Sequence, residues 1–151
     1  MSTDRIEKHV VLRTPRGRVW QALSNAQEFG NWFGVKLDGP FKAGARVRGK
    51  VTHKGYEDAP FELTIDRIEP EHQLAWRWHP NAVDPKAEYS QEPMTSVVFQ
   101  LDDAPVGTRL TVVESGFDSL PASRRAAAYE GNEKGWAMQM EAINKFIAQA
   151  A

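Results

Sequence analysis

The chain has 151 residues, a formal net charge of −1 and 26% charged residues, with lysine and arginine spread along its length. This pattern lacks the basic patch of a nucleic-acid-binding protein, so we expect no nucleic-acid partner. Cysteine is absent from the sequence, which excludes disulfides, thiolate metal sites and a thiol nucleophile. The length predicts a single domain over residues 1–151 with one hydrophobic core.

Residues 1–5 lack the apolar run of a signal peptide, and no apolar stretch approaches the roughly 20 residues that span a bilayer. We therefore expect no membrane span and a cytoplasmic location.

The N-terminal part of the chain predicts a strand followed by two short helices. Apolar and polar residues alternate over residues 6–13, which is typical of a half-buried strand. Apolar residues then recur at helical spacing within residues 15–23, and a second short turn follows over residues 27–29. Trp32-Phe33-Gly34 lies where the chain is expected to bend into a sheet.

A strand with two different faces is expected between Gly44 and His53. Its inward set is Ala45, Val47, Gly49, Val51 and His53, and its outward basic set is Arg46, Arg48 and Lys50. The missing side chain at Gly49 leaves room for a ligand, for Trp136 or for close helix packing. The basic set fits a solvated edge face, with an acidic partner as the alternative.

Four further strands follow at short intervals. Alternating apolar residues predict them over residues 61–65, 74–79, 97–101 and 110–114, with a bulge near residues 68–70 and a polar loop over residues 81–93. Glu114 breaks the apolar row of the last strand. Because consecutive strands have short connections, we expect an antiparallel sheet with one apolar face.

The last predicted element is a long helix between residues 120 and 147. Large side chains recur every three or four positions along it, at Tyr129, Asn132, Trp136, Met140, Ile143 and Ile147. No other element is long enough to cover the sheet. The predicted fold class is therefore α+β, a curved antiparallel sheet wrapped around a long C-terminal helix, with two short helices after the first strand.

Several of these segments carry a resemblance to a known family. They are Asn31-Trp32-Phe33-Gly34, Phe41-Lys42-Ala43-Gly44, Ile68-Glu69-Pro70, Gly107-Thr108-Arg109-Leu110-Thr111, Ser115-Gly116-Phe117 and Gly135-Trp136. In order and spacing they resemble the SRPBCC superfamily of START-like and birch-pollen-allergen domains, and within it the domains related to the activator of the ninety-kilodalton heat-shock protein ATPase. The resemblance covers nearly the whole chain and implies a helix-grip fold with a cavity between sheet and helix.

Large side chains on the inner faces are the candidate walls of that cavity. The candidate ligand-binding residues are Trp32, Phe33, His53, Phe61, Trp76, Trp78, Phe99, Glu114, Tyr129, Trp136 and Met140. The resemblance implies a small hydrophobic or aromatic ligand, lipid-like or polyketide-like. The alternative is that the same aromatic residues pack an ordinary core.

Glu114 and His53 are the candidate catalytic residues. Both lie at inward positions, where an unpaired carboxylate or imidazole is unfavourable, so each is expected to meet a partner, a water or a ligand. If they face each other, Glu114 acts as a general acid or base, and His53, Tyr56 or Tyr129 hydrogen bonds to a ligand carbonyl. The alternative is that both lie at open strand ends and face solvent.

Other kinds of site lack a motif. The four histidines have no metal-ligand spacing, and the sequence has neither a nucleophile elbow nor a phosphate-binding loop, so we expect no metal and no cofactor.

We expect the protein to be a monomer or a homodimer. Three candidate functions remain. The favoured one is binding of a small hydrophobic molecule. The others are a cyclase, dehydratase or hydrolase that uses Glu114 and His53, and a cochaperone-like interaction module.

Overall fold

The computed structural model describes residues 4–57, 59–80 and 92–150. Most of the loop predicted over residues 81–93 lies outside the described residues. The elements are, in chain order, β1 (Arg5–Leu12), α1 (Arg16–Ser24), α2 (Ala26–Phe33), β2 (Val35–Leu37), β3 (Arg46–Val51), β4 (Pro60–Glu69), β5 (Gln73–Trp78), β6 (Thr95–Ala104), β7 (Gly107–Ser115), the 3-10 turn η1 (Phe117–Ser119) and α3 (Ala122–Ala150).

The strands form one antiparallel sheet in the order β1-β7-β6-β5-β4-β3-β2. Strands that follow one another from β2 to β7 are neighbours, as their short connections predict. The first strand pairs with the last, with Ile6 opposite Glu114 and Val10 opposite Leu110. This long-range pairing places the first and the last strand of the chain side by side. The sequence analysis predicted neither this pairing nor the short strand β2.

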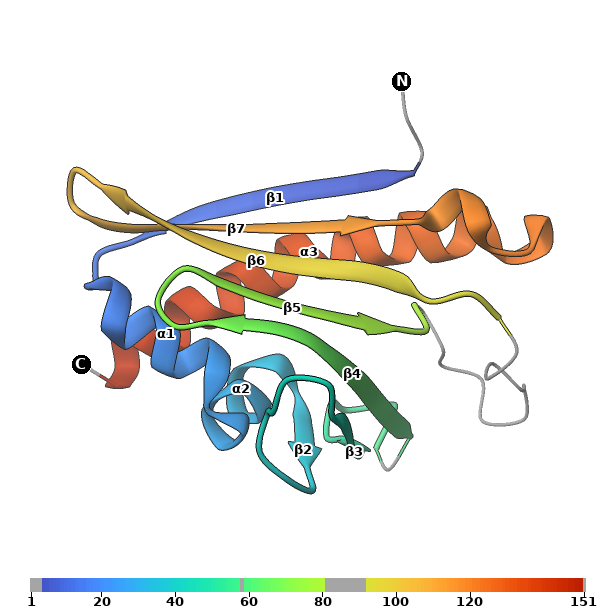
Figure 1. The fold of residues 1–151 in the computed structure, drawn as a ribbon, viewed down its shortest axis with the longest axis horizontal. Helices are drawn as coiled ribbons and strands as arrows, with labels where there is room; N and C mark the ends of the chain where they lie inside the picture. Colours follow the sequence, from blue (N-terminus) through green and yellow to red (C-terminus); the bar gives the residue numbers. More distant parts are fainter. Residues whose placement is uncertain (1–3, 58, 81–91, 151) are drawn as a thin grey trace.

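The long helix α3 lies along one face of the sheet, and α1 and α2 lie beside its C-terminal part (Figure 1). Its apolar stripe is buried as the spacing predicts, with Trp136, Met140, Ile143 and Ile147 all at most 5% exposed. Alternate residues of the central strands meet this stripe, among them Leu74, Trp76, Phe99, Leu110 and Val112, each fully buried. The predicted helix-grip arrangement of class α+β is therefore confirmed.

The bulge in β4 and the glycine in β3 have local causes. The register between β4 and β5 shifts between Ile65 and Arg67, so the predicted bulge exists but lies earlier in the strand than expected. A Cβ placed on Gly49 would lie 2.1 Å from the carbonyl oxygen of Lys36 in β2. Gly49 therefore allows the backbones of β2 and β3 to approach, and it opens no space for a ligand, for Trp136 or for a helix.

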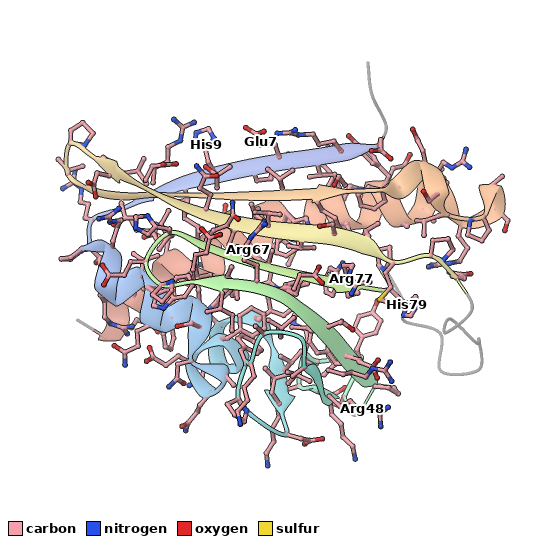
Figure 2. The ribbon with its side chains drawn as sticks, in the orientation of Figure 1. Glu7, His9, Arg48, Arg67, Arg77 and His79 are labelled. Carbon is pink, nitrogen blue, oxygen red and sulfur yellow. The ribbon has the colours of Figure 1, made fainter. Side chains whose placement is uncertain are left out.

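The other face of the sheet carries charged side chains, including Glu7, His9, Arg48, Arg67 and Arg77 (Figure 2). Two members of the basic set of β3 are paired across the strands, because Arg46 and Arg48 lie 3.2 and 3.0 Å from the Glu62 carboxylate. Exposed pairs of this kind contribute little to stability. They fit a solvated face, which was the favoured interpretation of this set.

Candidate functional site

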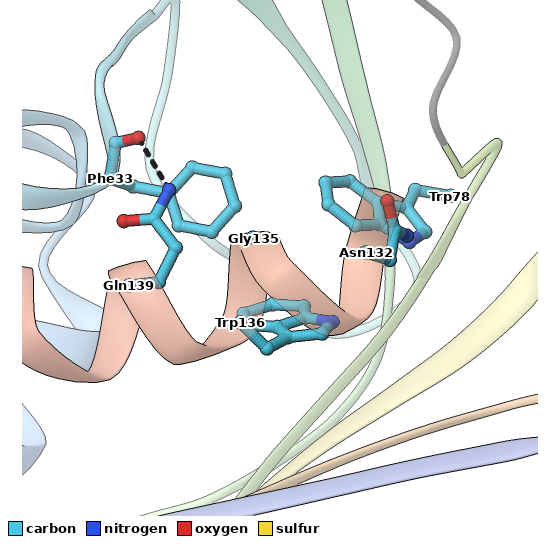
Figure 3. A pocket seen from close by; sticks show the side chains of 6 residues that line it. All are labelled: Phe33, Trp78, Asn132, Gly135, Trp136 and Gln139. Carbon is cyan, nitrogen blue, oxygen red and sulfur yellow. Dashed lines mark hydrogen bonds between the residues drawn. The ribbon is translucent and has the colours of Figure 1, made fainter. Parts of the chain in front are cut away.

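A pocket of about 150 Å³ opens beside the middle of α3. It is partly open to solvent, and its lining residues are Phe33, Trp78, Asn132, Gly135, Trp136 and Gln139. Three elements meet there, since Phe33 ends α2, Trp78 ends β5 and the other four residues lie on α3. The α3 residues recur at intervals of three and four, which places them on one side of the helix. Figure 3 shows Phe33 and Gln139 on one side of Gly135 and Trp78 with Asn132 on the other.

The space beneath α3 is filled mainly by aromatic rings. Trp136 is the centre of this group, with ring centroids 5.9 Å from Phe33, 5.9 Å from Trp78, 5.7 Å from Phe99 and 6.3 Å from Trp76. These distances are typical of rings in direct contact. Three of these rings, those of Phe33, Trp78 and Trp136, also line the pocket.

Glu114 lies behind the pocket as a fully buried carboxylate. Four side chains donate hydrogen bonds to it, two to each oxygen. Oε1 accepts from Asn132 Nδ2 at 2.9 Å and from Trp136 Nε1 at 2.7 Å, and Oε2 accepts from Trp78 Nε1 at 2.7 Å and from Thr95 Oγ1. An ionised carboxylate only accepts hydrogen bonds, so this set of donors matches its needs.

The fold brings these four donors together from separate parts of the chain. Thr95 begins β6 and Trp78 ends β5, so both lie near the end of the sheet where β7 carries Glu114. Asn132 and Trp136 are four residues apart on α3, and both point to the same oxygen. None of these four donors is charged, so among the described residues neutral hydrogen bonds compensate for the burial of this carboxylate.

Three of the four residues that donate to Glu114 also line the pocket. Trp78, Asn132 and Trp136 donate to the carboxylate and also line the pocket. A further hydrogen bond of 2.9 Å, from Gln139 Nε2 to the carbonyl oxygen of Phe33, joins α3 to the end of α2 (Figure 3). The walls of the pocket are therefore fixed by hydrogen bonds as well as by packing.

The candidate residues fall into several environments. Phe33, Trp78 and Trp136 line the pocket. Phe61, Trp76 and Phe99 pack against these rings without lining it. Met140 is a buried core residue.

Trp32 and Tyr129 are held by bonds elsewhere in the fold. Trp32 donates to the carbonyl oxygen of Ala22 at 2.8 Å, and Tyr129 donates to that of Arg5 at 3.1 Å.

The inward position expected for His53 is wrong. Strand β3 ends at Val51, so the alternation stops before His53, which is exposed on the following loop and stacks against Tyr56 at 6.4 Å. His53 is not among the hydrogen-bond partners of Glu114. The alternative of a position that faces solvent therefore holds for His53. Glu114 instead has the buried, inward position that was expected.

Sequence reasoning did not assign Asn132, Gly135 or Gln139 to the site. Asn132 was visible as the polar member of the apolar stripe, and Gly135 as a small residue within the long helix. Gln139 carries no such signal, because its contact with the Phe33 carbonyl depends on how α2 packs against α3.

Neither a metal-binding cluster nor a membrane-spanning helix occurs among the described residues. In that part of the chain, no group of three or more histidine, aspartate or glutamate side chains is placed to hold a metal ion. None of the helices described there is long and apolar enough to cross a membrane.

Comparisons with known proteins agree with the fold. The family model described as activator of Hsp90 ATPase homolog 1-like protein matches residues 13–148. No curated protein matches the sequence.

Solved structures of similar shape include protein MLL2253 from Mesorhizobium loti, which is 21% identical with a TM-score of 0.76 over 97% of this chain and 98% of its own. A protein from Arthrobacter aurescens is 16% identical, with a TM-score of 0.79 over 97% and 87%. DynU16, from the dynemicin biosynthetic locus, is 23% identical with a TM-score of 0.73, and this chain covers 48% of its length. At these identities the likeness concerns the fold.

Proposed function

The chain belongs to the family of activator of Hsp90 ATPase homolog 1-like proteins, and from that premise and the pocket beside α3 we propose that it binds a small hydrophobic or aromatic molecule. The observation that carries the proposal is the lining itself. Three aromatic side chains and a bare glycine form an apolar surface, and two amides add a few polar groups. This combination is typical of small-molecule sites.

The volume of the pocket limits how much of a ligand it can enclose. About 150 Å³ is below the range of roughly 300 to 1,000 Å³ found for drug-sized ligands, and an engineered apolar cavity of about 150 Å³ holds benzene. The enclosed part of the ligand is therefore about one ring. Because the pocket is partly open, a longer lipid-like or polyketide-like molecule extends from it towards solvent.

Burial of the ligand supplies the binding energy. A ring that loses about 150 Å² of apolar surface gains about 4 kcal/mol at 25 cal/mol per Å², before the loss of translational and rotational freedom. One ring alone therefore binds weakly. Contacts outside the pocket are needed for high affinity, which favours a ligand larger than the enclosed ring.

The alternative of acid–base catalysis by Glu114 and His53 receives less support. Both oxygens of Glu114 are occupied by protein donors and have no exposed surface, so a substrate would have to displace one of them. His53 is exposed on a loop and bonds to none of these groups. We infer that Glu114 acts by positioning the pocket walls. The cochaperone-like alternative stays a prediction, and pull-down of the heat-shock ATPase tests it.

The proposal is tested by NMR with a library of small aromatic and aliphatic molecules. The chain has five tryptophans, and their indole N–H signals report on separate places. We expect ligands to shift the signals of Trp78 and Trp136 saturably and to leave that of Trp20, which does not line the pocket, unchanged. If no molecule shifts the first two signals, or if all five shift together, the proposal is wrong.

A further inference from the structure

Gly135 lies near the middle of the 29-residue helix α3, where glycine is unfavourable. A glycine inside a helix costs about 1 kcal/mol relative to alanine. Steric contacts explain two other glycines, since a Cβ on Gly30 or Gly49 would lie 2.4 or 2.1 Å from a backbone carbonyl oxygen. A positive φ explains others, such as Gly34 at 92°. Neither reason holds for Gly135, because a Cβ placed there meets no atom within 4 Å.

The empty space at Gly135 belongs to the pocket. Gly135 is one of the lining residues, and Figure 3 shows it between Phe33 and Trp78. A side chain there would project into the pocket without disturbing the packing of the protein. The absence of a side chain therefore leaves bare helix backbone as one wall, against which a flat group packs closely.

Asn132 supplies a polar group at the same wall. Its Nδ2 donates to Glu114, and since a carboxylate only accepts, this bond fixes which end of the amide faces the core. The Oδ1 atom receives no hydrogen bond from the described residues. Because Asn132 lines the pocket, this oxygen is available to accept a hydrogen bond from a ligand.

We propose that Gly135 and Asn132 determine specificity, so that the pocket takes a flat aromatic ring bearing one hydrogen-bond donor, a hydroxyl or an N–H. The ring packs on the backbone at Gly135 with its edges against the aromatic walls, and the donor bonds to Asn132 Oδ1. This inference rests on the proposed function, because it names the ligand class of the same pocket.

The experiment compares two probes of equal size, phenol and toluene, by titration followed through the indole N–H signals of Trp78 and Trp136. Toluene is the more apolar probe, so burial alone favours it. We expect phenol to bind more tightly, by about threefold or more, because its hydroxyl donates to Asn132. Toluene binding as tightly as phenol, or more tightly, overturns the role of Asn132.

The role of Gly135 is tested with Gly135→Ala and with Gly131→Ala as the matched control. Both replace a glycine of α3, and Gly131 is exposed and does not line the pocket. We expect both variants to raise Tm, because alanine favours the helix. Only Gly135→Ala should weaken phenol binding, by about tenfold, because its methyl group overfills the pocket.

The outcomes separate this inference from the proposed function. Unchanged phenol affinity in Gly135→Ala, with binding intact in the parent protein, overturns the inference and leaves the proposed function standing. If neither probe shifts the signals of Trp78 and Trp136 in the parent protein, the inference fails, and the library titration decides the proposed function separately. A lower Tm in Gly135→Ala than in the parent also contradicts the inference, because it indicates that the methyl group meets protein atoms.

Discussion

Replacing Glu114 by glutamine tests whether this carboxylate holds the pocket walls. The two side chains have nearly the same shape, but the glutamine amide has one acceptor oxygen and a nitrogen that only donates. Each oxygen of Glu114 accepts two hydrogen bonds. The amide nitrogen is best placed towards Trp78 and Thr95, because the Thr95 hydroxyl can accept a hydrogen bond as well as donate one. The indole N–H of Trp78 then faces the nitrogen and loses its acceptor.

The magnitude follows from this count. A hydrogen bond to a charged group contributes about 1.5 to 3 kcal/mol, so the loss of the bond from Trp78 lowers the free energy of unfolding by about 2 kcal/mol. Because the residue is fully buried, water does not replace the lost acceptor. A loss of this size is a large fraction of the stability of an ordinary domain, which is about 5 to 15 kcal/mol.

The measurement is urea unfolding followed by tryptophan fluorescence. With a slope near 2 kcal/mol per M, the midpoint should fall by about 1 M while the slope stays the same. Glu133→Gln is the control, because Glu133 is exposed on α3 and its replacement should change stability by less than about 0.5 kcal/mol. A loss below about 1 kcal/mol in Glu114→Gln would refute the reasoning, because the donors would then have other partners.

Two further predictions concern the strands and loops around β3. Gly49→Ala should lower the free energy of unfolding by about 2 kcal/mol or more, because its Cβ meets the Lys36 carbonyl. Gly39→Ala is the control, because a Cβ there meets nothing within 4 Å, and this variant should be nearly neutral in the same unfolding assay. The pKa of Glu57 lies below its usual value because its own backbone N–H and that of Gly55 donate to its carboxylate. A carboxyl group whose pKa is lower in the folded than in the unfolded protein stabilises the fold. This stabilisation is fully present at a pH above the unfolded-state pKa and is lost as the pH falls through the folded-state pKa. The carboxyl carbon of Glu57 should therefore titrate below that of a glutamate in an unstructured peptide, and equal midpoints would contradict the assignment.

The sequence was sufficient for the helix-grip fold because periodicity is a local property. The alternation in β4 to β7 and the helical stripe of α3 are each visible within about a dozen residues. The pairing of β1 with β7 was not predictable in this way, because it joins residues more than 100 positions apart, such as Ile6 and Glu114. The short strand β2 was missed for another reason, since three residues are too few to establish a period.

The candidate site was predicted only in part. Phe33, Trp78 and Trp136 could be selected as large aromatic residues on inward faces, but the same criterion also selected Trp76 and Phe99, which pack the core. Which of several buried rings borders the open space depends on how they pack in three dimensions. His53 shows a related limit, because alternation predicts a face only as far as the strand continues.

The inward position of Glu114 has two explanations that only its partners distinguish. A buried carboxylate is consistent with acid–base chemistry and also with a structural role, and the donors that decide between them lie 18 to 36 residues away in the chain. Since three of those donors line the pocket, Glu114→Gln changes binding under either explanation. Loss of function in that variant would therefore not be evidence for catalysis.

Thr95→Val separates the two explanations. Thr95 donates to Glu114 Oε2 but does not line the pocket, and valine has nearly the same shape. If Glu114 only positions the walls, the variant should lose about 1.5 kcal/mol of stability, the contribution of one hydrogen bond to a charged group, and bind phenol with unchanged affinity. If Glu114 transfers protons, removing this donor should change the rate of turnover while the affinity for the ligand stays constant. Turnover in the parent protein, together with a changed rate at unchanged affinity in Thr95→Val, would therefore overturn the positioning role.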